Sequence, residues 1–96
     1  VIMPGLINTH GHIYSALARG MILADSKPSH SFQDILENLW WRVDRSLDLP
    51  EIKYSSYTTY IDCIKNGVTT FFDHHASAGR VKDSLFTIAD VAKELV

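Results

Sequence analysis

Cysteine is almost absent from this chain, since Cys63 is the only one among 96 residues. A single thiol excludes an internal disulfide and fits a reducing compartment, so we expect a cytoplasmic protein. Apolar residues make up 46% of the sequence, a normal share for a globular protein. No apolar run approaches the roughly 18 residues of a membrane-spanning helix. The sequence therefore predicts neither a disulfide framework nor a membrane segment.

An excess of charge of one sign is also lacking. Lysine and arginine together number 9, aspartate and glutamate together number 11, and the net charge is −2. These charges are spread along the chain, without the basic cluster that a nucleic-acid or membrane surface requires. We therefore expect neither nucleic acid nor a membrane as a partner.

Proline and glycine are few, but a Pro-Gly pair at positions 4–5 opens the most informative stretch. An apolar run follows it and ends in two histidines one residue apart. If residues 6–12 form a strand, His10 and His12 share one face and Gly11 points to the other. Two adjacent imidazoles can hold one metal ion, and zinc or iron(II) suits imidazole nitrogen. We predict His10 and His12 as metal ligands; the alternative is a pair of surface or core histidines at a strand end.

Hydrophobic periodicity and capping signals divide the rest of the chain into elements. In order, we expect a loop or short irregular helix at 13–21, a loop at 25–30, a helix capped by Ser31 and Asp34 that ends before Asp48, a helix from Pro50 to about Lys65, a strand at 68–73, a turn at 76–80 and a last helix from about 81. The second strand shows little alternation, which is typical of a strand buried on both faces of a parallel sheet. This βαβα order predicts an α/β fold.

Each predicted helix carries a stripe of apolar residues that we expect to be buried. The three stripes are Phe32, Ile35, Leu36, Leu39, Trp40, Val43 and Leu47; Ile52, Tyr57, Tyr60, Ile61 and Ile64; and Val81, Leu85, Ile88, Ala92 and Leu95. Small residues such as Ser55 and Ser56 allow close approach of a neighbouring element. Cys63 is expected to be a packed thiol.

Three stretches carry a resemblance to a known family. They are residues 4–12 (PGLINTHGH), 18–21 (ARGM) and 67–73 (GVTTFFD). The first and last resemble the first two barrel strands of the amidohydrolase superfamily, in the aminohydrolase/chlorohydrolase branch that includes cytosine, guanine and adenosine-type deaminases. Within that branch the chain most resembles an aminohydrolase group linked to selenium metabolism. The resemblance covers nearly the whole chain.

The resemblance implies a fragment of a (β/α)8 metal-dependent hydrolase barrel. Such a barrel needs about 250 residues, so residues 1–96 are expected to be one incomplete domain with the first two strands and their helices. The implied activity of the intact protein is hydrolysis of a non-peptide C–N bond, by deamination of a small heterocycle through metal-activated water. Alternatives are a chlorohydrolase-like enzyme acting on another bond, and a stand-alone non-catalytic α/β module that binds metal or a partner.

The family's remaining metal ligands and proton-transfer residues come from later strands, so we expect no catalytic residue within the fragment. The fragment alone should be inactive, should bind metal weakly or not at all, and should self-associate through exposed apolar surface. A single divalent metal is implied for the intact protein, with zinc favoured over iron(II).

Further residues at the strand ends are candidates for the substrate pocket or its surroundings. We predict Arg19, Asp44, His74 and His75 as substrate-pocket residues, although a structural salt bridge is favoured for Arg19. Adjacent strand residues face opposite ways, so only one of His74 and His75 can point inward. Asp73 could orient a metal-bound histidine, but structural use is favoured.

Two positions depart from the adenosine-type deaminases of the branch. Asp44 stands where those enzymes carry a glutamate that holds ribose hydroxyls, and Ile35 stands where they carry a tryptophan that packs on the substrate. The loop at 25–30 is also a few residues longer than in those enzymes. These departures argue against an adenosine-like substrate. Tyr14, Trp40 and Trp41 could line a pocket, but core packing is the favoured role for aromatic residues at helical spacing.

Overall fold

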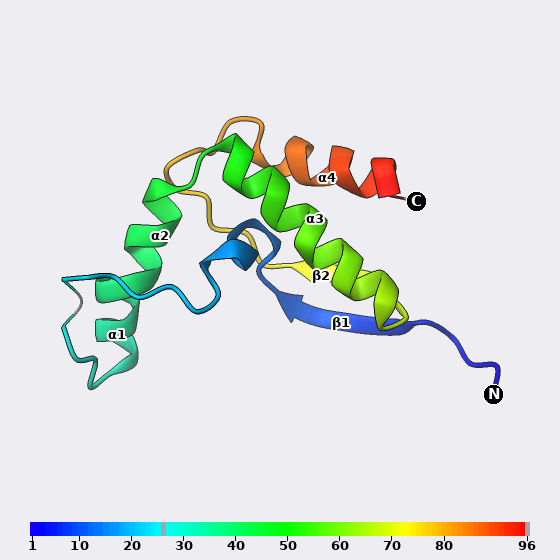
Figure 1. Ribbon diagram of the computed structural model, residues 1–96, viewed down its shortest axis with the longest axis horizontal. Helices are drawn as coiled ribbons and strands as arrows, with labels where there is room; N and C mark the ends of the chain where they lie inside the picture. The colour runs from blue at the N-terminus through cyan, green and yellow to red at the C-terminus, as the bar shows by residue number, and fades with distance from the viewer. Residues whose placement is uncertain (26, 96) are drawn as a thin grey trace.

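The computed structural model describes residues 1–25 and 27–95. Strand β1 (Leu6–Gly11) pairs in parallel with strand β2 (Val68–Asp73), which confirms both predicted strands. Figure 1 shows both strands pointing toward the side of the molecule where α1 (Phe32–Ile35) and α2 (Trp41–Ser46) lie. The carboxyl ends of the two strands therefore meet at one place.

The connection from β1 to β2 begins with the 3-10 helix η1 (Ile13–Ala18), which matches the predicted short irregular helix. The predicted loop at 25–30 contains no helix or strand at its described residues, which are 25 and 27–30. A π-helical turn, η2 (Leu36–Trp40), then joins α1 to α2, so the expected helix forms with one irregular turn.

Helix α3 (Leu49–Lys65) has both of the end signals that its sequence indicates. The Asp48 backbone N–H donates to Glu51 Oε2 at 3.0 Å, one half of a capping box. At the other end Gly67 has a φ of +70°, a left-handed conformation that glycine adopts without cost. The last helix, α4, spans Ser84–Leu95.

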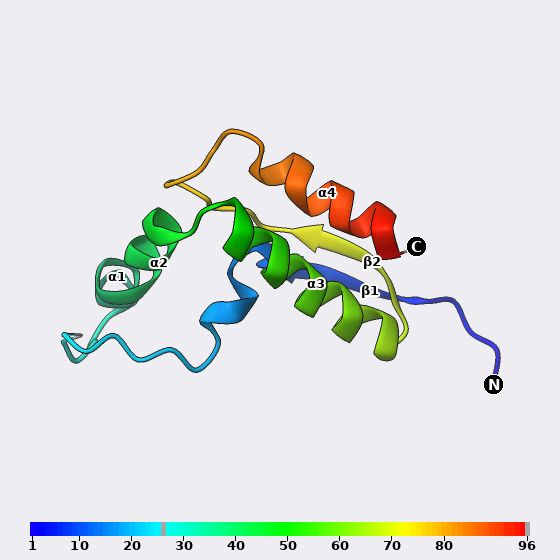
Figure 2. The ribbon, with the colours of Figure 1, turned by 45° about the horizontal axis from the view of Figure 1, so that its top comes forward.

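The core lies between one face of the sheet and the helices η1, α3 and α4, and Figure 2 shows α3 and α4 running alongside the strands. Its members are Ile13, Tyr14, Ile52 and Ile88, with Leu47, Tyr60 and Phe71 packed against them. Ser55 and Ser56 are fully buried. The Leu17 backbone N–H donates to Ser55 Oγ at 3.2 Å, so the small residues of α3 do allow η1 to approach closely.

Several side chains that we expected to be buried are exposed. On the first stripe Phe32 is 73% exposed, and on the last stripe Val81 is 77% exposed. The other exposed members of the predicted stripes are Ile35, Ile61, Ile64 and Leu85. The stripe predictions were wrong at these positions. Periodicity shows which side chains share a face of a helix, but among the described residues a neighbouring element covers only part of each face. On α4 the buried residues are Ser84, Ile88 and Val91.

Strand β2 is also not buried on both faces, since Phe72 is 59% exposed. Phe71 packs on the core, and a Cβ at Gly11 would collide with its ring, so both residues point to the helix side. Ile7 pairs with Thr70, and alternation sets Thr70 and Phe72 against Phe71 and sets His10 against Gly11. Ile7, His10, Thr70 and Phe72 therefore lie on the opposite face, which we call the open face. No described helix is long and apolar enough to cross a membrane.

Candidate metal centre

Three histidine side chains converge at the carboxyl ends of the two strands. One ring nitrogen from each of His10, His12 and His74 lies within 4.8 Å of those of the other two. The ring centroids of His10 lie 5.1 Å from those of His12 and 4.8 Å from those of His74. All three side chains are exposed, so an ion could reach them from solvent.

The ring of His12 is held in one tautomer by the neighbouring strand. Its Nδ1 lies 2.6 Å from the backbone carbonyl oxygen of His74. A carbonyl only accepts, so Nδ1 carries a proton, and in the neutral ring Nε2 is then the nitrogen with the lone pair. This hydrogen bond is the usual way in which a protein directs an imidazole toward a metal. The His12 ring also stacks on Trp40 with centroids 6.3 Å apart.

The three histidines open into a hollow of about 430 Å³ between the strand ends and the helices α1 and α2. The other lining residues are Tyr14, Phe32, Leu36, Trp40, Trp41, Asp44, His75 and Ala76. Most of this wall is aromatic or aliphatic, and a few polar groups face into it. That composition is typical of a small-molecule site.

Asp44 lines this hollow and is only 7% exposed. The Tyr14 hydroxyl donates to Asp44 Oδ1 at 2.6 Å. Burial and this bond to the carboxylate raise the pKa of Tyr14 above its ordinary value, so the phenol stays protonated at neutral pH. The pair joins η1 to α2 and fixes one side of the hollow. Tyr14 itself belongs to the core, as predicted for an aromatic residue in this position.

Asp73 and His75 lie on the helix side of the sheet. Asp73 Oδ1 accepts a hydrogen bond from the Ile13 backbone N–H at 2.9 Å, so the carboxylate holds the start of η1. His75 Nε2 lies 3.0 Å from Ser84 Oγ, and its Nδ1 lies 3.4 Å from Asp73 Oδ2. Asp73 thus contacts the η1 backbone and His75, and it makes no hydrogen bond to His10 or His12 within residues 1–25 and 27–95.

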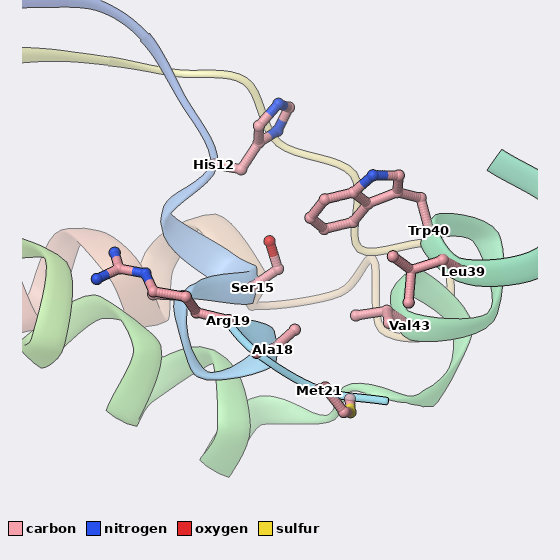
Figure 3. A pocket seen from close by; sticks show the side chains of 10 residues that line it. His12, Ser15, Ala18, Arg19, Met21, Leu39, Trp40 and Val43 are labelled. Carbon is pink, nitrogen blue, oxygen red and sulfur yellow. The ribbon is translucent and has the colours of Figure 1, made fainter. Parts of the chain in front are cut away.

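Arg19 lies beside a second hollow, of about 390 Å³, that His12 and Trp40 also line. Figure 3 shows its side chain extending away from both of these rings. The side chain is exposed, and the salt bridge that we favoured for it is not found in the described part of the chain. Arg19 is therefore near the histidine site but is not directed into it.

The sequence analysis did not predict that His74 would join His10 and His12. The signal was present, because His74 is two residues after Phe72 and period-2 alternation puts both on one face. What the sequence could not give was the register of β2 against β1, which brings His74 level with the end of β1. The His74 backbone N–H donates to the Gly11 carbonyl oxygen at 2.7 Å.

The chain thus has two parallel strands joined by helices, with a cluster of three histidines at the carboxyl ends of the strands, which defines an α/β protein with a candidate site at that end. All of residues 1–96 match the Amidohydrolase family, and the chain belongs to that family. No solved structure matches the chain.

The curated relatives include several named deaminases. The chain is 32% identical over all 96 of its residues to a 5-methylthioadenosine/S-adenosylhomocysteine deaminase of Pyrococcus furiosus, and it covers 19% of that protein. It is 33% identical over 82% of its length to a protein of the same name from Halothermothrix orenii, covering 17% of it. It is 36% identical over 76% of its length to a 5'-deoxyadenosine deaminase of Methanococcus aeolicus, covering 16% of it. The chain thus spans about a fifth of the length of these relatives.

Proposed function

We propose that the intact protein is a metal-dependent hydrolase of a non-peptide C–N bond that deaminates a small heterocycle. The observation that carries this proposal is the pair His10 and His12 at the carboxyl end of a parallel strand, in a chain of the Amidohydrolase family. The deaminase names of the relatives support it. In this proposal residues 1–96 form the first two strands, with their helices, of a (β/α)8 barrel, and thus one incomplete domain.

The residues present fit a divalent metal ion of the zinc type, with iron(II) as the alternative. Imidazole nitrogen suits both ions, and the hydrogen bond of His12 Nδ1 to the His74 carbonyl leaves Nε2 as the nitrogen available to an ion. When bound, such an ion acts as a Lewis acid that lowers the pKa of a water molecule toward neutral pH. Within this chain His10 and His12 would hold the ion, the Trp40 ring stacks on that of His12, and the Tyr14–Asp44 pair forms part of the wall of the hollow.

For the substrate we propose a heterocycle without an adenosine-like ribose contact at Asp44. Asp44 Oδ1 is already bonded to Tyr14, and the residue is nearly buried, so little of this carboxylate remains for ribose hydroxyls. Ile35 offers no aromatic face for stacking. The relatives' names point toward adenosine-type compounds, so these are the reference substrates to test against. A cytoplasmic location and the lack of nucleic-acid or membrane partners stay predictions from composition.

The test is an assay of the intact protein on a panel of amino- and chloro-substituted heterocycles, with methylthioadenosine and 5'-deoxyadenosine included. We expect ammonia release, with turnover of other heterocycles exceeding that of the two nucleosides. Chloride release without ammonia would favour the chlorohydrolase alternative. Preference for the nucleosides would overturn the substrate proposal and leave the deaminase proposal intact.

The ligand assignment is tested separately by His10→Ala in the same protein. This variant should lose both bound metal and activity, because it removes one imidazole of the site. His30→Ala, which removes an exposed histidine outside the cluster, is the matched control and should keep both. Near-stoichiometric metal in His10→Ala would refute the assignment.

A further inference from the structure

A third histidine stands beside the two proposed metal ligands. We propose that His74 is itself a ligand, so that His10, His12 and His74 form a three-imidazole site for a divalent transition-metal ion within this chain. The inference rests on the proposed function in one respect, because it takes His10 and His12 as ligands. It goes beyond that function because it assigns a metal-binding role to the residue that follows β2. The ends of two neighbouring strands then supply three ligands to one ion.

The distances allow this site with small side-chain movements. Ligand nitrogens bound at about 2.0–2.1 Å in a tetrahedral site lie about 3.3 Å from one another. The three ring nitrogens already lie within 4.8 Å of one another, so each must move by on the order of an ångström to reach that spacing. All three side chains are exposed, so this movement displaces no part of the core. The rings can therefore close on an ion by rotation about their side-chain bonds.

The backbone of His74 is fixed in position for this role. Its N–H donates to the Gly11 carbonyl oxygen at 2.7 Å, and its carbonyl oxygen accepts from His12 Nδ1 at 2.6 Å. These two bonds tie the segment after β2 to the end of β1 on both sides of one residue. The chain thus loses little conformational entropy when His74 coordinates an ion, which favours binding.

The chemistry of the donor set indicates which ligand belongs there. The cluster contains three imidazoles and no carboxylate, and such a set suits zinc and the later first-row divalent ions better than magnesium or calcium. Three protein ligands on one side also leave a coordination position open toward the 430 Å³ hollow. A site of that kind admits water or a small molecule.

The neighbouring residue provides an internal control. His75 is adjacent in sequence but turns to the helix side, where its Nε2 lies 3.0 Å from Ser84 Oγ. It takes no part in the cluster. If any histidine near the end of β2 were sufficient, His74 and His75 would be equivalent. Coordination requires a side chain that faces the other two histidines, so only His74 can take part.

The test measures Co²⁺ and Zn²⁺ binding to the full chain by calorimetry and by the visible absorption of bound Co²⁺. His74→Ala should weaken binding by at least about tenfold, or 1.4 kcal/mol, and should change the Co²⁺ spectrum. His75→Ala should keep the wild-type affinity and spectrum. His74→Asn serves as the second variant, because it removes the imidazole but keeps a polar side chain, and it should weaken binding as His74→Ala does.

The possible results separate this inference from the proposed function. Wild-type affinity in His74→Ala, together with lost affinity in His10→Ala, would overturn the role of His74 alone and leave the two-histidine assignment in place. Equal losses in His74→Ala and His75→Ala would also overturn it, because the effect would not depend on geometry. Wild-type affinity in His10→Ala would instead refute the ligand assignment of the proposed function.

Discussion

At the residue scale, the bond between Tyr14 and Asp44 is the buried polar contact that borders the candidate site. The two residues are 2% and 7% exposed, and the hydroxyl–carboxylate distance is 2.6 Å. Tyr14→Phe removes the donor and leaves a buried carboxylate without it. We expect the free energy of unfolding to fall by about 1–3 kcal/mol, as measured by urea denaturation.

Tyr57→Phe is the matched control for that substitution. The Tyr57 hydroxyl also donates to a carboxylate, that of Glu94, but this pair is at the surface. Water replaces a lost surface contact, so Tyr57→Phe should lower the free energy of unfolding much less than Tyr14→Phe does. Equal losses in the two variants would mean that burial of Asp44 does not set the strength of the Tyr14 bond.

The individual site residues were predictable from the sequence to different degrees. His10 and His12 follow from strand alternation alone, since two residues one apart must share a face. The same rule states that His74 and His75 must diverge, but it does not say which of them meets the other histidines. That choice depends on the register between two strands separated by more than fifty residues, which no local pattern contains.

At the element scale, the first helical segment depends on a carboxylate at its N-terminus. Asp34 Oδ2 accepts hydrogen bonds from the backbone N–H groups of His30 and Ser31 at 2.9 and 3.1 Å. These bonds, with that from His30 the largest cause, lower the pKa of Asp34 below its ordinary value. The cap therefore stabilises the folded state above the ordinary carboxyl pKa, and its contribution is lost as the pH falls through the lowered value.

The pH dependence of this cap is tested with Asp34→Asn. An amide cannot ionise, so the stability difference between the wild type and Asp34→Asn should be present at pH 7 and should shrink below about pH 4. Thermal unfolding followed by circular dichroism at pH 7 and at pH 3 measures this difference. Ser31→Ala removes the hydroxyl half of the capping box and should cost stability at both pH values. A difference for Asp34→Asn that is the same at pH 7 and pH 3 would contradict the ionised cap.

Element ends were predicted well because their causes are local. The Ser31–Asp34 cap that we predicted depends on residues within one helical turn. The same is true of the Asp48–Glu51 box and the Gly67 stop that the structure shows, so the sequence contains the full cause of each. Burial was predicted less well. Exposure of Phe32 or Val81 depends on which element lies opposite, and that is a property of the assembled chain.

At the scale of the whole molecule, the two strands form a sheet with one covered face. Helices η1, α3 and α4 cover the side of Phe71, while the open face carries Ile7 at 61% and Phe72 at 59% exposure. Both edges of the two-stranded sheet are also unpaired within the described residues. Exposed apolar side chains next to unpaired strand edges favour association with another surface.

We therefore predict that the 96-residue chain self-associates through its open face. Its apparent mass in sedimentation velocity should rise above the monomer value of 10.8 kDa as concentration increases. Phe72→Lys places a charge on the open face and should shift this association to higher concentration. Phe86→Lys makes the same change at a 74% exposed position on α4 and should leave association unchanged, because α4 does not contribute to the open face. Equal shifts in both variants would place the contact elsewhere, and a monomer at all concentrations would refute the prediction.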